Sequence, residues 1–152
     1  MGSRFLIKYI LYLLALLGLL YIDILPLSNI LNSFQIELIS KALGLFLDIE
    51  GNRIIITPHY RLIIERDCNG LMVYYIFLAT ILALRAELRY KIIWASLGYI
   101  TITAVNIFRI FIITNLVLRA KSNFYLAHDI FGNILLFITA ISLFALFIKF
   151  NR

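Results

Sequence analysis

The sequence predicts an all-α integral membrane protein with about four transmembrane helices. Of its 152 residues, 63% are hydrophobic and 14% are charged, whereas a soluble domain has about 45–50% apolar and about 25% charged residues. Long uncharged runs recur along the chain, and about 20 mostly apolar helical residues cross a hydrocarbon core of about 30 Å. This composition excludes a disordered, collagen-like or disulfide-stapled chain. It predicts a single membrane domain over residues 1–152.

Four apolar stretches are the predicted spans. They lie at roughly residues 5–25, 68–86, 92–117 and 129–149. The second is short and needs the side chains of Arg85 and Arg89 to reach the headgroups. The first begins with basic residues, as a secretory signal does, but Ile24, Leu25 and Pro26 offer no cleavage site of small residues. We therefore expect a retained anchor.

The net charge of +6 could indicate nucleic-acid binding, but the positions of the basic residues favour a membrane topology instead. They gather before the first span, between spans two and three, and after span four (Arg4, Lys8, Arg85, Arg89, Lys91, Lys149 and Arg152). Short links that are rich in lysine and arginine stay in the cytosol. Both termini are thus predicted to be cytosolic, with residues 26–67 on the extracytoplasmic side and no nucleic acid as a partner.

The extracytoplasmic segment is predicted to hold an amphipathic helix and a small β-hairpin. Residues Ser28 to Leu47 mix apolar and polar positions at helical spacing, which suits a helix that lies at the interface or caps the bundle. Two β-branched runs follow, Arg53 to Thr57 and Arg61 to Glu65, joined by a turn that contains Pro58 and His59. This pattern is typical of a hairpin, and His59 is expected to be solvated.

Cys68 is the first candidate for a catalytic residue, because it lies where the outer segment meets the second span. A helix start offers unpaired N–H groups and a partial positive charge, which lower the pKa of a thiol. The alternative is a small hydrophobic residue buried in a core. As the single cysteine, it excludes an internal disulfide.

Arg109 is the second candidate for a functional residue, because it is the single charge in a long apolar stretch. An arginine near the centre of a spanning helix costs at least about 2.5–3.5 kcal/mol and usually marks a functional or paired group. The alternatives are that it reaches the outer headgroups or pairs with Asp23. Asn106 lies one turn away on the same face and is placed to hold the guanidinium.

His128 and Asp129 open the fourth span at its outer end, where a polar cap is the alternative reading. The predicted topology thus brings Cys68, Arg109 and His128 toward one face of the bundle. A cysteine nucleophile needs a proton-transfer partner and a cation for the oxyanion, and these are the three groups present. One cysteine and two distant histidines do not make a four-ligand site, so neither a metal nor a cofactor is predicted.

At these residues the chain resembles the exosortase/archaeosortase family of membrane-embedded, transpeptidase-like cysteine enzymes. The resemblance covers roughly Gly51 to the C-terminus and rests on three short motifs in order: Cys68-Asn69-Gly70-Leu71, then Asn106-Ile107-Phe108-Arg109-Ile110, then His128 with Gly132 four residues on. The chain departs from the family in carrying Asn69 where serine is usual. It is also much shorter than the large members, which predicts a small, minimal-length form.

The resemblance implies a catalytic set of Cys68, Arg109 and His128, with Asn106, Asn69 and Asp129 in support. Cys68 would form a thioester with the substrate, Arg109 would stabilise the oxyanion or thiolate, and His128 would transfer protons. The implied substrates are secreted proteins with a C-terminal motif, a transmembrane helix and a basic end. The implied place is the outer face of the cytoplasmic (inner) membrane, with membrane lipid around the protein and the hairpin as a wall for the peptide.

A second function class stays open at this point. A non-catalytic polytopic membrane subunit or a small transporter would use Arg109 structurally or to bind an anion. A peptidase without transfer would share the site and differ only in its acceptor. The cleaved motif, the acceptor and the oligomeric state are also open.

Overall fold

The computed structural model describes residues 2–21, 26–119, 128 and 132–151. Its elements alternate between long helices and one small sheet, and they follow each other in the order α1 (Gly2–Tyr21), α2 (Pro26–Leu43), β1 (Ile49–Glu50), β2 (Arg53–Thr57), β3 (Tyr60–Ile63), η1 (Arg66–Cys68), α3 (Leu71–Ala83), α4 (Leu88–Arg119) and α5 (Asn133–Phe150). The protein is therefore mostly helical, as its apolar runs predict.

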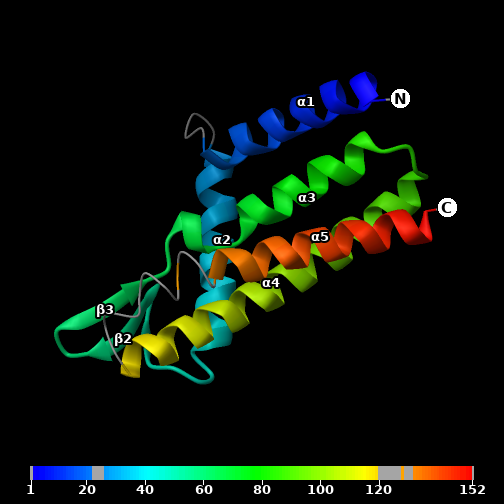
Figure 1. Ribbon diagram of the computed structural model, residues 1–152. Coiled ribbons are helices and arrows are strands. Elements are labelled where there is room, and N and C mark those ends of the chain that lie inside the picture. Colours follow the sequence, from blue (N-terminus) through cyan, green and yellow to red (C-terminus); the bar gives the residue numbers. More distant parts are fainter. Residues whose placement is uncertain (1, 22–25, 120–127, 129–131, 152) are drawn as a thin grey trace.

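Helices α1, α3, α4 and α5 run side by side and form a bundle (Figure 1). Helix α1 packs mainly on α3, and α3, α4 and α5 pack on one another. The sheet lies beyond one end of this bundle, whereas α1 begins and α5 ends at the other (Figure 1). We call these the sheet end and the terminal end. Helix α2 runs crosswise to the bundle near the sheet end (Figure 1).

Three of the four bundle helices have the length and composition of a membrane span: α1 over Arg4–Tyr21, α4 and α5. Helix α3 is apolar but has only 13 residues, about 20 Å at 1.5 Å per residue. It stops where Leu84 turns to an extended conformation (ψ 154°), ahead of the charged link to α4. A count of four spans therefore stays a prediction.

The predicted hairpin is part of a three-stranded antiparallel sheet in the order β1-β2-β3. Ile54 of β2 pairs with Leu62 of β3, and the additional strand β1 pairs with β2 through a turn at Gly51, whose φ of 64° favours glycine. The expected second strand is shifted, because β3 begins at Tyr60 and ends at Ile63. Ile54 and Ile64 pack on Ile39 of α2 and on other apolar residues, which anchors the sheet to the helices.

Helix α2 buries some uncharged polar residues and exposes some large apolar ones. Asn32 and Gln35 are buried, whereas Ile30 and Phe34 are 61% and 60% exposed. A surface helix in water turns its apolar stripe to the core and its polar residues outward. A helix is present here as predicted, although it ends at Leu43 and not at Leu47. Two of its amides face the interior, whereas the charged residues Glu37 and Lys41 stay exposed.

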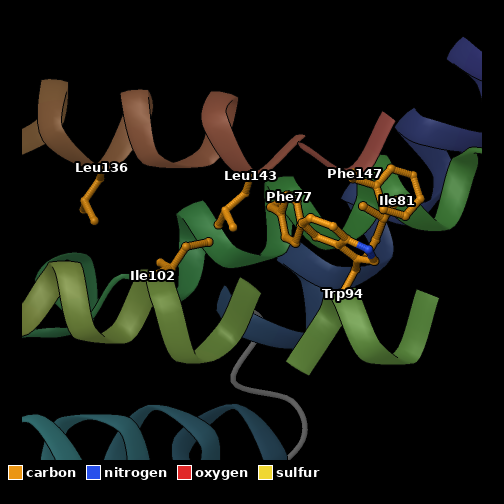
Figure 2. Packing of buried hydrophobic residues seen from close by; sticks show 7 residues of the cluster. All are labelled: Phe77, Ile81, Trp94, Ile102, Leu136, Leu143 and Phe147. Atoms are coloured by element: carbon orange, nitrogen blue, oxygen red, sulfur yellow. The ribbon is translucent and has the colours of Figure 1, made fainter. Parts of the chain in front are cut away.

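The main apolar core lies between α3, α4 and α5 (Figure 2). Its buried members are mostly large aliphatic and aromatic side chains: Phe77, Ile81, Trp94, Ile102, Leu136, Leu143 and Phe147. The rings of Trp94 and Phe147 meet edge to face at 5.9 Å, an arrangement that the aromatic quadrupole favours. Gly98 makes room for Phe77, because a Cβ there would lie 2.3 Å from the phenyl ring.

Candidate functional site

Cys68 lies at the end of η1, and the three residues after it steer the chain into α3. Gly70 has a φ of 78°, which favours glycine, and a Cβ there would press on the Asn106 side chain at 3.2–3.3 Å. Asn69 is fully buried, and its Oδ1 accepts a hydrogen bond of 2.9 Å from the N–H of Leu71. This bond satisfies one of the free donors at the start of a helix. The residues of the Cys-Asn-Gly-Leu run therefore end η1 and start α3.

Arg109 lies on α4 and is only 3% exposed. Its guanidinium donates to three acceptors: Asn106 Oδ1 at 3.4 Å, the backbone oxygen of His128 at 3.3 Å and Asn133 Oδ1 at 3.2 Å. The expected contact with Asn106 is present. Asp23, the alternative partner, lies outside the described residues. The planar guanidinium can serve several acceptors at once, so Arg109 ties α4 to the start of α5.

His128 meets the cysteine directly. Its Nε2 lies 3.1 Å from Cys68 Sγ, within the range in which a proton passes between a nucleophile and a base. Asp129, expected to support the histidine, lies outside the described residues. His59 is exposed in the turn between β2 and β3, as expected of a solvated residue.

Asn106 joins the thiol segment to the cation. Its Nδ2 donates to the backbone oxygen of Cys68 at 2.9 Å, while its Oδ1 accepts from Arg109. The side chain is fully buried, so both bonds form away from water, where they are electrostatically stronger. The structure thus brings Cys68, Arg109 and His128 together and places Asn106 between two of them.

The electrostatics of the thiol differ from the sequence-based expectation. Burial raises the pKa of Cys68 above its ordinary value, and the nearby carboxylates of Asp67 and Glu65 act in the same direction. The Arg109 guanidinium lowers it but does not outweigh the burial. Desolvation disfavours the charged form of an acid, so the surroundings of Cys68 favour the neutral thiol.

A small cavity of about 70 Å³ opens beside these three side chains. Cys68, Arg109 and His128 line one part of it, and the rest is almost wholly apolar. The apolar part comes from the sheet and from α4, chiefly Ile54, Leu62, Ile64, Ile110 and Ile113, with the hydroxyl of Thr114. Small-molecule sites combine an apolar wall with a few convergent polar groups in this way, but they are larger, at about 300–1,000 Å³.

Two amides in the surroundings of the site were not predicted: the exposed Asn133, which accepts from Arg109, and the buried Gln35 of α2. The available signal was a polar residue within an otherwise apolar run. Among the residues that the structure describes, no group of three or more His, Cys, Asp or Glu side chains is placed to hold a metal ion.

Comparison with known proteins gives one informative match. A family model described as Transmembrane exosortase matches residues 2–146. No curated protein and no solved structure matches the chain. The family match covers almost the whole sequence and extends beyond the three motifs that line the site. The chain therefore belongs to the transmembrane exosortase family, a family of membrane transpeptidases and proteases.

Proposed function

We propose that this protein is a cysteine transpeptidase or protease that cleaves C-terminal sorting tails of secreted proteins through a thioester on Cys68. The observation that carries the proposal is the 3.1 Å separation between Cys68 Sγ and His128 Nε2, beside a buried guanidinium and a cavity. Exosortases act on secreted proteins with C-terminal sorting signals, and such a substrate brings a peptide bond to the site.

In the first half of the proposed reaction, His128 takes the proton of the thiol as Sγ attacks the scissile carbonyl carbon. Because burial raises the pKa of Cys68, a base acting during the attack accounts for activation better than a preformed thiolate does. The carbonyl oxygen becomes an anion, and Arg109, which borders the same cavity, stabilises its charge. The C–N bond then breaks, the leaving amine takes the proton from His128, and the acyl group stays on Cys68 as a thioester.

In the second half, a nucleophile attacks the thioester and the C–S bond breaks. His128 takes the proton of this acceptor and returns one to the thiolate, so the enzyme regains its resting state. Water as the acceptor gives hydrolysis, and an amine or a lipid-borne group gives transfer. Asn106 supports both halves, because it holds the Cys68 backbone and the Arg109 guanidinium at the same time.

For the topology we propose the cytoplasmic membrane, with both termini cytosolic and the site on the extracytoplasmic side. Helix α1 begins and α5 ends at the terminal end (Figure 1). The basic link between α3 and α4 lies at this end too, because Asn151 donates to the backbone oxygen of Arg85 at 3.1 Å. Positive charge is retained in the cytosol, which leaves the sheet end and Cys68 on the outer side.

The decisive experiment compares the wild type with Cys68→Ala in membranes that contain a secreted substrate with a sorting motif, a transmembrane helix and a basic end. We expect tail removal to stop in Cys68→Ala, while its melting temperature in detergent stays close to wild type. The mass of the product then separates hydrolysis from transfer. Unchanged tail removal in Cys68→Ala would refute the proposed function and favour the non-catalytic reading.

Topology is tested separately with a membrane-impermeant thiol reagent. Because Cys68 is the single cysteine, any labelling of the intact chain reports this residue. We expect labelling from the outer side in sealed cells. Labelling that requires entry of the reagent into the cytosol would contradict the orientation.

A further inference from the structure

Two of the buried polar side chains of α2, Asn32 and Gln35, reach the chain just after Cys68. Ser28, Asn32, Gln35 and Ser40 are all less than 9% exposed. Burying a polar side chain is costly unless it forms hydrogen bonds, and the two amides in this group do form them. The partners of these amides therefore show which part of the molecule α2 holds in place.

Gln35 has the most connected amide of the helix. Its Nε2 donates to the backbone oxygen of Asn69 at 3.3 Å and to Thr103 Oγ1 at 3.1 Å. Its Oε1 accepts from the hydroxyl of Tyr99 at 2.6 Å. The oxygen and the nitrogen of the amide thus both form hydrogen bonds with α4. The nitrogen also donates to the backbone just after Cys68.

Asn32 holds the same segment through a side chain. Its Oδ1 accepts from Asn69 Nδ2 at 2.8 Å, while its own Nδ2 donates to the backbone oxygens of Ser28 and Leu20 at 2.9 Å and 3.3 Å. The amide of Asn69 is therefore fixed between α2 on one side and the first turn of α3 on the other.

Two consecutive peptide oxygens at the site are held by buried amides from different helices. Asn106 of α4 donates to the oxygen of Cys68, and Gln35 of α2 donates to the oxygen of Asn69. Gly70 follows immediately and has a conformation that only glycine adopts readily, so the segment has little stiffness of its own on that side. These two bonds act together with those of the Asn69 side chain to orient the segment.

We propose that Gln35 is a positioning residue for the reaction: by holding the Asn69 oxygen, it keeps Cys68 Sγ facing His128 Nε2. Gln35 does not line the cavity, so it acts through the backbone and not on the substrate. The role in turnover rests on the proposed function, whereas the effect on the thiol–imidazole pair does not. A misplacement of about 1 Å between reacting groups can lower a rate by about a hundredfold.

The test uses the alkylation rate of Cys68 by iodoacetamide, which needs no substrate. His128→Ala is made in the wild type and in Gln35→Met, a variant with an unbranched side chain of similar length and no hydrogen-bonding amide. We expect His128→Ala to slow alkylation about tenfold in the wild type and less than twofold in Gln35→Met. The same factor in both backgrounds, including no effect in either, would overturn the proposal.

Two further variants keep the test independent of folding. Tyr99→Phe removes only the hydroxyl that fixes the Gln35 oxygen, while its ring keeps the contact with Tyr74 at 5.4 Å. We call the factor by which His128→Ala slows alkylation the coupling, and we expect Tyr99→Phe to reduce this coupling as Gln35→Met does. Glu37→Gln is the matched control, since Glu37 is exposed on the same helix and pairs with Lys41 at the surface. It should behave as the wild type does, and an equal loss of coupling in Glu37→Gln would refute a specific role for Gln35.

Turnover supplies the readout that separates the two proposals. We expect Gln35→Met to lower kcat for tail removal tenfold or more and to leave KM within twofold, because the cavity is untouched. If Cys68→Ala still removes tails while the alkylation coupling depends on Gln35, the proposed function fails and the positioning role stands. If Cys68→Ala is inactive and the coupling is insensitive to Gln35, the positioning role fails and the proposed function stands.

Discussion

The two ends of the bundle are built from the same helices but are held together by different forces. At the terminal end and through the middle, α3, α4 and α5 bury aliphatic and aromatic side chains such as Phe77, Trp94 and Phe147 (Figure 2). At the sheet end the same helices bury Asn69, Asn106 and Arg109, and hydrogen bonds replace ring contacts. The first end therefore depends mainly on apolar packing, whereas the sheet end adds a buried polar network to the apolar contacts of the sheet.

This difference predicts that stability and activity can be damaged separately. A change of volume in the apolar part disturbs packing, whose cost spreads over many weak contacts. A change at the sheet end leaves specific polar groups without partners. The predictions that follow test this separation.

The largest effect is expected for Arg109→Gln. Removing a group that stabilises an oxyanion lowers kcat by about 10²–10³-fold in known cases, and we expect a loss of that size in the rate of tail removal. Arg109→Lys should recover less than a tenth of the lost rate, because an ammonium cannot reproduce the planar set of donors. Wild-type rates in Arg109→Lys would show that charge alone is needed.

Gly132→Ala is expected to act on the same group from α5. A Cβ at Gly132 would lie 2.3 Å from Arg109 Nε, and the guanidinium is buried and held by partners on two helices. Arg109 must therefore move, and we expect tail removal to slow by about tenfold to a hundredfold. The rate per folded molecule is the measurement, and an unchanged rate would mean that Arg109 has freedom that the structure does not indicate.

Gly98→Ala is the matched change in the apolar part. Its Cβ would also come within 2.3 Å of a side chain, in this case the ring of Phe77. Overpacking a core costs about 1–3 kcal/mol, so we expect a lower melting temperature in detergent. Tail removal per folded molecule should stay within twofold of wild type, and a larger loss would show that packing and site are coupled.

The smallest effect concerns the pH profile of Cys68 alkylation. Because burial raises the pKa of the thiol, the thiolate fraction at neutral pH is smaller than in a free cysteine, and alkylation should rise only at higher pH. Arg109→Gln removes an attraction for the thiolate and should shift the profile further upward. Asp67→Asn removes a repulsion and should shift it downward. Shifts of equal sign in both variants would contradict this balance.

Hydropathy and flanking charge predicted the helices because spanning helices need apolar runs of a minimum length. The contact between Cys68 and His128 could be anticipated only as proximity, since the distance depends on how the start of α5 folds over α3 and α4. The upward shift of the thiol pKa was missed because it comes from burial near isoleucines of the sheet. No local pattern around Cys68 reports that packing.

The burial of Asn32 and Gln35 on α2 could not be predicted by the usual argument for amphipathic helices. That argument assumes that water lies outside and the apolar core inside. For Gln35 and Asn32 the polar partners are Tyr99, Thr103 and Asn69, which come from distant parts of the sequence. Strand β1 was missed for a simpler reason, since two residues carry almost no periodic signal.

The length of α4 has a consequence for the proposed cleavage of sorting tails. Its 32 residues make a rod of about 48 Å, longer than a hydrocarbon layer of about 30 Å. Arg109 stands about 31 Å from the start of this rod, counted at 1.5 Å per residue. Under the proposed function, the position of Arg109 along α4 fixes the depth of the site in the membrane. The spacing between the scissile bond and the first apolar turn of the tail should then be nearly constant among substrates.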